Sequence, residues 1–335
     1  MKRLRIVAAA LVCLAAAPGP VRAAEESVTF TQGWLIQGTT SPFFAAIDLG
    51  YYKKANLNVN IARGFGSADT AKKVASGAVP YGIADAGVVV VARSRGAKIK
   101  LLALETAQSQ YAWFALKGSG ISTPKDLEGK TTGTPEGDLH KTLFPALAKI
   151  NHIDSKKLRW ITLPPTAMIG SLITGKIDAM PILSIVAPII RAAAQKAGKE
   201  IVMIPWANWG IDIYSLGLIA TDERIAQNPG QVRRFVDASV RGIAWAVEHP
   251  GRAAEILKKY NPEINVALAR ANWEINIDSL LTPEAAKIGI SKMGEVKMTR
   301  TRDLMTQYSN LPAVVPVKDL YTNEFTPVLF PKRGK

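Results

Sequence analysis

The stretch SPFFAAIDLGYYKKANLNVNI, residues 41–61, indicates a helix that is followed at once by a short strand. Ser41 is a good N-cap, and Pro42 suits the first helical position. Residues 57–61 alternate apolar side chains with asparagines, as a strand with one buried face does. With a further strand expected over residues 28–30, the chain opens as strand, loop, helix and strand, which is a βαβ unit.

Further helix–strand units follow this one along the chain. A helix is expected over residues 69–76, with Gly77 as its stop, and an apolar strand comes directly after it. A second helix should begin at Asp85 and end near Gly96, before another apolar strand. Alternation of helices and strands with short connections is typical of an α/β fold.

Two segments far apart in the chain share one pattern. Residues 75–86 and residues 173–184 each pass from a helix end, through a glycine, into a short apolar strand. Because 335 residues exceed the usual size of a single core, this echo favours two lobes. We expect residues 24–112 to begin the first lobe, residues 113–207 to form the second, and residues 208–335 to complete the first and to add C-terminal helices. These include a helix opened by Asn228-Pro229, with a buried apolar stripe, and a shorter helix over residues 283–293.

The first 23 residues have the features of a secretory signal peptide. Basic residues precede an apolar run that is too short to span a bilayer, and prolines then end this run. Small residues follow, as a signal peptidase requires. We expect cleavage after Ala23 or Ala24 and hence export from the cytoplasm, with a membrane anchor as the alternative.

Composition narrows the chemistry that the mature chain can perform. Cys13, the single cysteine, lies in the expected signal peptide, so the mature chain has no thiolate and no disulfide. The formal net charge of +15 falls by four, to +11, when Lys2, Arg3, Arg5 and Arg22 are removed. The remaining basic residues are scattered, and the chain is exported, so they favour a charged surface over nucleic-acid binding.

Residue patterns for catalysis are scarce. The histidines His140, His152 and His249 show no metal-binding spacing, and no nucleophile elbow or Walker sequence occurs. GFGSAD, at residues 64–69, lacks the third glycine of a dinucleotide-binding fingerprint. His140 is expected in an exposed first helical turn close to Glu136. Binding is therefore favoured over turnover, and we expect no cofactor and no metal.

Loops that lead from a strand into a helix are the regions where an open α/β sheet binds ligands. Free backbone N–H groups and helix dipoles point there. Four such loops carry candidate residues, which are Trp34, Gln37, Thr40 and Ser41; Gly66, Ser67 and Asp69; Ala84, Asp85 and Ala86; and Thr134, Pro135, Glu136 and Gly137. Each residue alone is more often an ordinary helix cap, but four converging loops indicate a ligand site.

Three tryptophans bear on this site. Trp206 and Trp209 bracket Asn208, in a stretch where the chain should return to the first lobe. Large flat side chains there can line a cleft and stack on a planar ligand, or they can pack a hinge, and the sequence leaves both readings open. Trp34, directly after the first strand, is the stronger candidate for contact with a ligand.

Four segments together resemble the periplasmic substrate-binding proteins of ABC transporters, in the group that includes thiamine-pyrimidine, alkanesulfonate and nitrate receptors. Residues 41–61 resemble the early helix-and-strand signature of this group, although Ala55-Asn56 stands where Glu-Gly is usual. VASGAVPYGIADA resembles a second signature, with Pro80 in place of aspartate. ISTPKDLEGKTTGTPEG and SLITGKIDAMPI resemble the signatures of the second lobe. The likeness covers about residues 28–220.

This resemblance implies a two-lobed clamshell, each lobe a mostly parallel sheet flanked by helices, that binds a small molecule between the lobes. It implies a monomeric periplasmic receptor without enzymatic activity or a nucleic-acid partner, which delivers its ligand to an inner-membrane permease. Trp34 falls where the pyrimidine-binding branch carries a tryptophan, and ETAQSQYAWFAL resembles the same branch, so a small planar heteroaromatic ligand such as a pyrimidine is expected. The candidate ligand-binding residues are Trp34, Gln37, Ser41, Gly66, Ser67, Asp85, Gln108, Pro135, Glu136, Trp206, Asn208 and Asp212.

Three alternatives stay open at this point. The ligand can be a sulfonate, nitrate or another small anion. The protein can be a secreted enzyme of the same fold that acts on a pyrimidine precursor, for which His140, Glu136 and Asp212 are the candidate bases. It can also be a basic surface-binding protein, which would show strong salt dependence and no saturable binding of small ligands.

Overall fold

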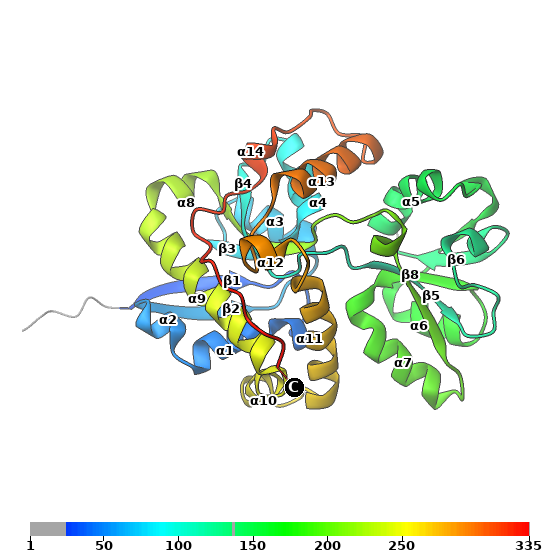
Figure 1. Ribbon diagram of the computed structural model, residues 1–335, viewed down its shortest axis with the longest axis horizontal. Helices are drawn as coiled ribbons and strands as arrows, with labels where there is room; N and C mark the ends of the chain where they lie inside the picture. Colours follow the sequence, from blue (N-terminus) through cyan, green and yellow to red (C-terminus); the bar gives the residue numbers. More distant parts are fainter. Residues whose placement is uncertain (1–24, 136–137, 335) are drawn as a thin grey trace, which may run out of the picture.

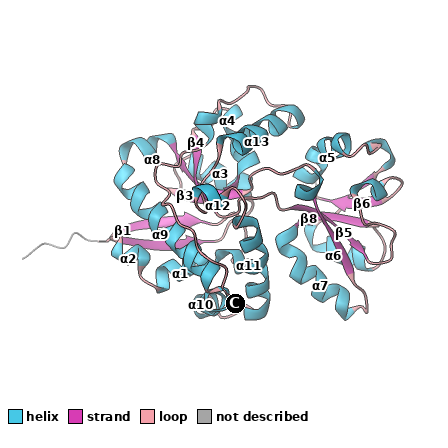
Figure 2. Ribbon diagram, viewed as in Figure 1, coloured by secondary structure: helices cyan, strands magenta, loops and turns pink. Residues whose placement is uncertain are grey.

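The computed structural model describes residues 25–135 and 138–334, so the expected signal peptide lies outside the described residues. Two α/β lobes lie side by side and are joined by extended segments of chain (Figure 1). Strands form the centre of each lobe and helices flank them (Figure 2). Within the described part of the chain, no helix is both long and apolar enough to cross a membrane. The predicted two-lobed α/β architecture is confirmed.

The sheet of the first lobe has five strands. Their order is β2 (Leu57–Ala62), β1 (Glu26–Thr31), β3 (Tyr81–Asp85), β10 (Leu216–Thr221) and β4 (Ile99–Leu104). Strands β2, β1 and β3 are parallel, whereas β10 runs antiparallel to both of its neighbours. The expected alternation holds in β2, where Leu57 and Val59 are buried and the asparagines between them are exposed.

The sheet of the second lobe repeats this arrangement. Its order is β7 (Arg159–Thr162), β6 (Thr131–Thr134), β8 (Ala179–Leu183), β5 (Tyr111–Leu116) and β9 (Ile201–Pro205). Here β5 is the antiparallel strand. In both sheets the antiparallel strand is the first one that the chain forms after crossing from the other lobe.

The similar sequence segments 75–86 and 173–184 correspond to this repeated arrangement. Strands β3 and β8, which end the two similar segments, occupy the same third position in their sheets. Each follows a helix and a glycine with a positive φ of 75°, Gly77 before β3 and Gly175 before β8. The predicted helix–glycine–strand unit in each lobe is therefore confirmed.

Helices cover both sheets. In the N-terminal half they are α1 (Ser41–Asp48), α2 (Tyr51–Lys54), α3 (Ser67–Ala75) and α4 (Ala86–Ser94), and in the second lobe α5 (Leu139–Ile150), α6 (Pro165–Ile173) and α7 (Ala187–Lys196). The C-terminal helices are α8 (Asp222–Gln227), α9 (Pro229–Glu248), α10 (Pro250–Tyr260), α11 (Val266–Leu280), α12 (Ala285–Ile288), α13 (Glu295–Tyr308) and α14 (Val317–Leu320). Short 3₁₀ helices are η1 (Gly38–Thr40), η2 (Pro124–Leu127), η3 (Ser155–Lys157), η4 (Ser184–Val186) and η5 (Trp206–Trp209).

The opening helix differs in detail from the sequence prediction. Helix α1 has Thr40, and not Ser41, at its N-cap, because η1 comes directly before it. The Ser41 hydroxyl donates to the carbonyl oxygen of Gly38 at 2.7 Å. Gly50, with a positive φ of 72°, separates α1 from α2. The helix that the sequence predicts is thus two short helices with a bend between them.

Aromatic side chains fill the core of the first lobe on one face of its sheet. The ring of Phe30 in β1 lies 4.9 Å from Phe43 of α1 and 5.4 Å from Phe235 of α9, between ring centroids. Phe235 also stacks on Tyr81 of β3 at 4.1 Å. These contacts join the first strands of the chain to its C-terminal helices, so the C-terminal region completes the first lobe.

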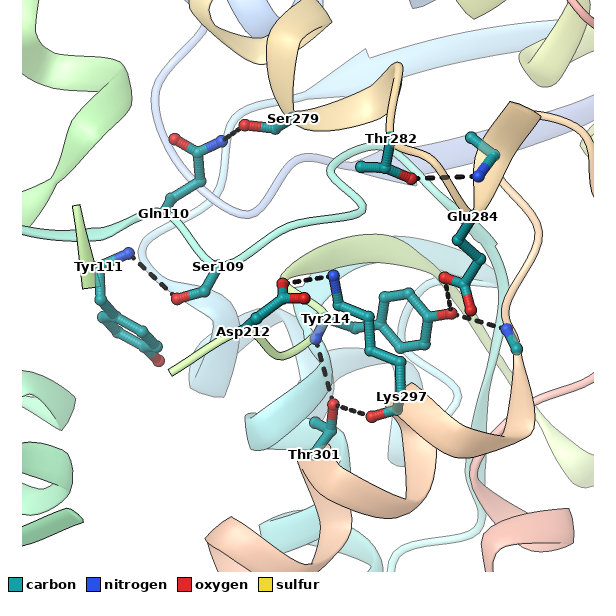
Figure 3. Close-up of polar contacts among 12 residues, drawn as sticks. Ser109, Gln110, Tyr111, Asp212, Tyr214, Ser279, Thr282, Glu284, Lys297 and Thr301 are labelled. Carbon is teal, nitrogen blue, oxygen red and sulfur yellow. Dashed lines mark hydrogen bonds and ion pairs between the residues drawn. The ribbon is translucent and has the colours of Figure 1, made fainter. Parts of the chain in front are cut away.

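Two crossover segments connect the lobes, and each is fixed by a C-terminal helix (Figure 3). In the first, residues 105–110, Gln110 donates from Nε2 to the hydroxyl of Ser279 in α11. In the second, residues 206–215, Asp212 pairs with Lys297 of α13 at 2.5 Å, and the backbone N–H of Tyr214 donates to the Thr301 hydroxyl at 3.1 Å. Both segments are therefore anchored to the first lobe.

The end of the chain corrects one expectation. The sequence predicts a helix over residues 283–293, but α12 covers only Ala285–Ile288. Gly289 ends it in a left-handed conformation, with a φ of 92°. The longer helix α13 follows, and the sequence analysis did not anticipate it.

Candidate functional site

A cavity of about 320 Å³ lies between the lobes, with walls from both. The first-lobe wall carries most of the polar side chains, which are Gln32, Gln37, Thr39, Thr40, Ser67 and Glu105, together with the apolar side chains Trp34, Leu35, Ile83 and Leu216 and the glycines Gly33 and Gly66. The second-lobe wall consists of Pro135, Asp138, Met168, Pro181, Ile182, Leu183, Ile185 and Val186. A volume in this range is typical of a small-molecule site.

The loop after β1 holds Trp34 at the edge of this cavity. The N–H of Gly64 donates to the carbonyl oxygen of Trp34 at 2.9 Å, and the N–H of Gly66 donates to Gly33 at 2.9 Å. These bonds join the loop after β1 to the loop after β2. The indole of Trp34 is nevertheless 51% exposed, which is unusual for so large an apolar side chain held in a fixed loop. It therefore offers a flat surface that a ligand can cover.

A close contact between η1 and α11 positions the polar groups of Thr39. A Cβ at Gly38 would lie 2.1 Å from the carbonyl oxygen of Ala269, so only glycine lets η1 approach this helix so closely. The N–H of Thr39 then donates to Asn272 Oδ1 at 3.0 Å, and Asn272 Nδ2 donates to the carbonyl oxygen of Ile185 at 2.6 Å. Asn272 thus joins one residue of each cavity wall.

Ser67 and Asp85 belong to one hydrogen-bonded corner behind the first-lobe wall. Asp85 is the N-cap of α4 and accepts from the N–H of Gly87 at 2.8 Å and from the hydroxyl of Ser215 at 3.2 Å. Its own N–H donates to Ser67 Oγ at 3.1 Å. Burial raises the pKa of the Asp85 carboxyl to about 6. Ser67 lines the cavity, whereas Asp85 supports it from behind.

Asp138 is the charged residue of the second-lobe wall, and it is paired with His140. Asp138 Oδ1 accepts from the backbone N–H of His140 and lies 2.8 Å from His140 Nδ1. Burial tends to raise the pKa of Asp138, but the hydrogen bonds and charge of His140 outweigh this and keep it below its usual value. Asp138 therefore presents a carboxylate to the cavity.

His140 itself is buried, which corrects the expectation of an exposed first-turn histidine. Helix α5 starts at Leu139, with Asp138 as its N-cap, so the His140 ring turns inward. It packs edge-on against Tyr111 and Trp206, with ring centroids 4.8 and 5.4 Å apart, and is 3% exposed. The Nε2 atom is buried without a partner among the described residues.

The structure brings only part of the predicted site together. Trp34, Gln37, Gly66, Ser67 and Pro135 line the cavity. Ser41 and Asp85 are buried behind the first-lobe wall, and Gln108, Asn208 and Asp212 lie in or beside the crossovers. Trp206 is completely buried beside Tyr111 and Trp113, so it packs within the protein, and Trp209 is half-buried. Glu136 lies outside the described residues.

Sequence reasoning missed two acidic side chains that line the cavity, Glu105 and Asp138. Glu105 is the last residue of the apolar segment IKLLALE. An acidic residue at the end of such a segment was the available signal for a side chain in the site. It also missed the apolar second-lobe wall, because those residues read as ordinary core of β8 and the turn after it. Nothing in their spacing distinguishes a cavity wall from a packed interior.

The described residues that line the cavity include acidic side chains but no basic ones. None of the described residues that line it is lysine, arginine or histidine, although the chain carries a net charge of +15. In residues 25–135 and 138–334, no three His, Cys, Asp or Glu side chains come together as a metal site would require. Buried polar atoms without a partner among the described residues include Gln32 Nε2 and Glu105 Oε2, both from lining residues. The cavity thus offers hydrogen bonds and apolar contact to an uncharged molecule.

Comparison with known proteins agrees with this architecture. The family model described as NMT1/THI5 like matches residues 37–253, which include both crossovers and the described parts of both cavity walls from Gln37 onward. The chain belongs to the NMT1/THI5-like family.

Relatives of this NMT1/THI5-like chain carry names of two kinds. Riboflavin-binding protein RibY of Chloroflexus aurantiacus is 25% identical over 324 residues, which cover 93% of this chain and 90% of RibY. The formylaminopyrimidine-binding protein of Halalkalibacterium halodurans is 22% identical and covers 76% of this chain, with 77% of its own length matched. A 4-amino-5-hydroxymethyl-2-methylpyrimidine phosphate synthase of Legionella pneumophila is 24% identical, with 72% of this chain and 76% of the synthase matched.

Solved structures identify the fold of this family member. The periplasmic aliphatic sulphonate binding protein SsuA of Escherichia coli superposes with a TM-score of 0.66 at 13% identity, and the match covers 92% of this chain and 96% of SsuA. A ligand binding component of an ABC-type import system from Staphylococcus aureus gives a TM-score of 0.65 at 13% identity, covering 90% and 97%. The NMT1/THI5-like chain therefore has the periplasmic-binding-protein fold.

Proposed function

We propose that this protein is a monomeric extracytoplasmic receptor, which binds a small planar heteroaromatic molecule between its lobes and delivers it to the permease of an ABC importer. The observation that carries this proposal is the cavity itself. It combines the half-exposed indole of Trp34, a polar first-lobe wall and an apolar second-lobe wall. A planar ring can stack on the indole and lie under the apolar wall while its polar edge bonds to the first lobe.

Charge favours an uncharged ligand over a sulfonate or nitrate. Transferring an unpaired anion out of water is costly, and none of the described lining residues offers a cation to pair with it. The carboxylate of Asp138 would repel an anion further. Two relatives are named for binding riboflavin and formylaminopyrimidine, both heteroaromatic compounds, and this supports the same choice.

The periplasmic location and the permease partner are part of the proposal. They are supported by the basic and apolar N-terminal sequence and by the fold shared with a component of an import system. We also propose that residues 113–207 move as one unit relative to the rest of the chain when the cavity closes.

Melting of the purified protein with a panel of solutes tests the function. The panel contains riboflavin, formylaminopyrimidine, 4-amino-5-hydroxymethyl-2-methylpyrimidine, an alkanesulfonate and nitrate. A solute present at a hundred times its Kd should add about 2.7 kcal/mol to the free energy of unfolding. A saturable shift with a heteroaromatic compound supports the proposal. A shift with only the sulfonate or nitrate contradicts the proposal. So does a melting temperature that none of the solutes changes.

A secreted enzyme that acts on a pyrimidine precursor is the second candidate, and the Asp138–His140 pair beside the cavity favours it. A histidine oriented by a carboxylate is a common arrangement for a general base. Incubation with 4-amino-5-hydroxymethyl-2-methylpyrimidine, followed by mass spectrometry, distinguishes the two functions. A product that disappears in His140→Gln indicates an enzyme, whereas binding without any product indicates a receptor.

A further inference from the structure

Of the described residues that line the cavity, Glu105 has the most deeply buried carboxyl group, with only 2% of the residue exposed. It follows β4 at the start of the first crossover. Its N–H donates to the carbonyl oxygen of Leu216 at 2.8 Å, and its carbonyl oxygen accepts from Asn276 Nδ2 at 2.9 Å. The backbone is thus fixed on both sides, while Oε2 of the side chain has no partner among the described residues. A buried polar atom without a partner is costly unless something else bonds to it.

Among the described residues, none beside Glu105 carries a charge that could hold it ionised. The elements packed around it present Thr39 from η1, Asn276 from α11 and Leu216 from β10, and none of these side chains titrates. Asp138, across the cavity, is the other acid among its described lining residues. Burial raises the pKa of Glu105 to about 8, against a smaller opposing effect of a hydrogen bond with the Thr39 side chain. At neutral pH the carboxyl group therefore keeps its proton.

Building on the receptor function proposed above, we propose that Glu105 recognises the ligand as a neutral carboxylic acid, donating a hydrogen bond from its side chain to an acceptor atom on the ligand. The acceptor is a ring nitrogen or a carbonyl oxygen. Asp138, ionised on the opposite wall, accepts a hydrogen bond from an N–H or amino group of the same ligand. The expected ligand class is a neutral heteroaromatic compound with an acceptor on the edge facing the first lobe and a donor facing the second.

This assignment gives a specificity rule. A ligand of the same shape without the acceptor would leave the Glu105 proton unpaired in a dry cavity, and sites built to bond a polar group reject analogues that lack it. An anion would meet one ionised acid and one neutral donor, with no cation among the described lining residues.

The first experiment measures the Kd of riboflavin at pH 7 and pH 9 for the wild-type protein, Glu105→Gln and Asp138→Asn. With a pKa of about 8, Glu105 is about tenfold less protonated at pH 9, so wild-type affinity should fall about tenfold. The amide of Glu105→Gln donates at both pH values, so its Kd should be the same at pH 7 and pH 9. Asp138→Asn should keep the pH dependence of the wild type, because the titrating group is still present.

The second experiment needs no ligand and tests the protonation state alone. Folding raises the pKa of Glu105 from 4.5 to about 8, so the folded state holds this proton more tightly than the unfolded state. The stability from this group is complete below pH 4.5 and is lost as the pH rises to about 8. The melting temperature of the wild type, relative to that of Glu105→Gln, should therefore fall between pH 4.5 and pH 8 and then level off.

The two experiments separate this inference from the proposed function. A wild-type Kd for riboflavin that is equal at pH 7 and pH 9 overturns the donor role of Glu105 and leaves the receptor function intact. A melting difference that is flat from pH 4.5 to pH 8 overturns the neutral carboxyl group, with or without a ligand. If riboflavin and the other heteroaromatic solutes fail to bind at any pH, the proposed ligand class is wrong, and so is the recognition role of Glu105.

Discussion

The two walls of the interlobe cavity differ in chemistry although the two lobes share one sheet plan. The first-lobe wall consists mainly of the segments that follow strands, and it carries glutamines, threonines, a serine and Glu105. The described part of the second-lobe wall consists mainly of β8, η4 and one side chain of α6, and all of its described residues except Asp138 are apolar. The same arrangement of strands thus supports a largely polar wall on one side of the cavity and a largely apolar wall on the other.

The difference suggests an order of events in binding. Polar groups on a fixed wall can select a ligand by hydrogen bonds while the cleft is still open to water. An apolar wall gains most of its free energy when it closes over the ligand and excludes water. We therefore expect substitutions in the first-lobe wall to change which ligand binds, and substitutions in the second-lobe wall to change how tightly every ligand is held.

The largest expected effect comes from making the second-lobe wall polar. In Leu183→Asp, closure would bury an uncompensated charge, a situation that costs about 3–5 kcal/mol. The affinity for riboflavin, measured by calorimetry, should fall at least about a hundredfold. Leu183→Met, which keeps the wall apolar, is the matched control and should bind within a few-fold of the wild type. An aspartate variant that binds normally would mean that this wall does not cover the ligand.

A smaller loss is expected from removing the indole on the opposite wall. If a planar ligand stacks on Trp34, Trp34→Ala should weaken binding by roughly 1–3 kcal/mol. The melting temperature should hardly change, because half of the side chain is already exposed. Leu35→Ala alters the neighbouring lining residue without removing an aromatic ring and serves as the control. Equal losses in both variants would indicate general apolar contact and not stacking.

The smallest effect concerns the residue that joins the walls. Asn272→Ala leaves the N–H of Thr39 and the carbonyl oxygen of Ile185 without their partner, which should lower the free energy of unfolding by about 1–2 kcal/mol. Denaturant unfolding measures this loss. Asn265→Ala removes the N-cap of the same helix, α11, and should lower stability by about 1 kcal/mol without changing the affinity for riboflavin. A free energy of unfolding that is unchanged in Asn272→Ala would argue against a bridging role for Asn272.

Much of the fold could be predicted from local signals. The alternation of β2, the glycine stops before β3 and β8, and the long apolar stripe of α9 depend on residues close together in the chain, and the structure confirms them. Helix α13 was missed because its sequence, EVKMTRTRDLMTQY, is mostly polar, and only Met298, Thr301 and Met305 are buried. Such a narrow contact face leaves little periodicity to detect.

The site was harder to predict, because it depends on contacts between residues distant in sequence. The loops after β1 and β2 could be predicted as part of the site, because glycines and candidate N-cap residues mark them in the sequence. The burial of Glu105 could not be predicted from its neighbours in sequence, because it results from α11 and β10, which lie more than a hundred residues further along the chain. His140 was placed at the surface because its neighbours in sequence are polar, while Tyr111 and Trp206 bury it from elsewhere.

The position of β10 has a consequence for how the chain folds as it is made. All five strands of the second sheet lie between Tyr111 and Pro205, so that sheet can assemble from one continuous stretch. The first sheet cannot, because β10 separates β3 from β4 and is not synthesised until residue 221. Until then β4 has no neighbouring strand, and closing so long a loop is slow. The first lobe is therefore the first to be synthesised and the last to complete its sheet.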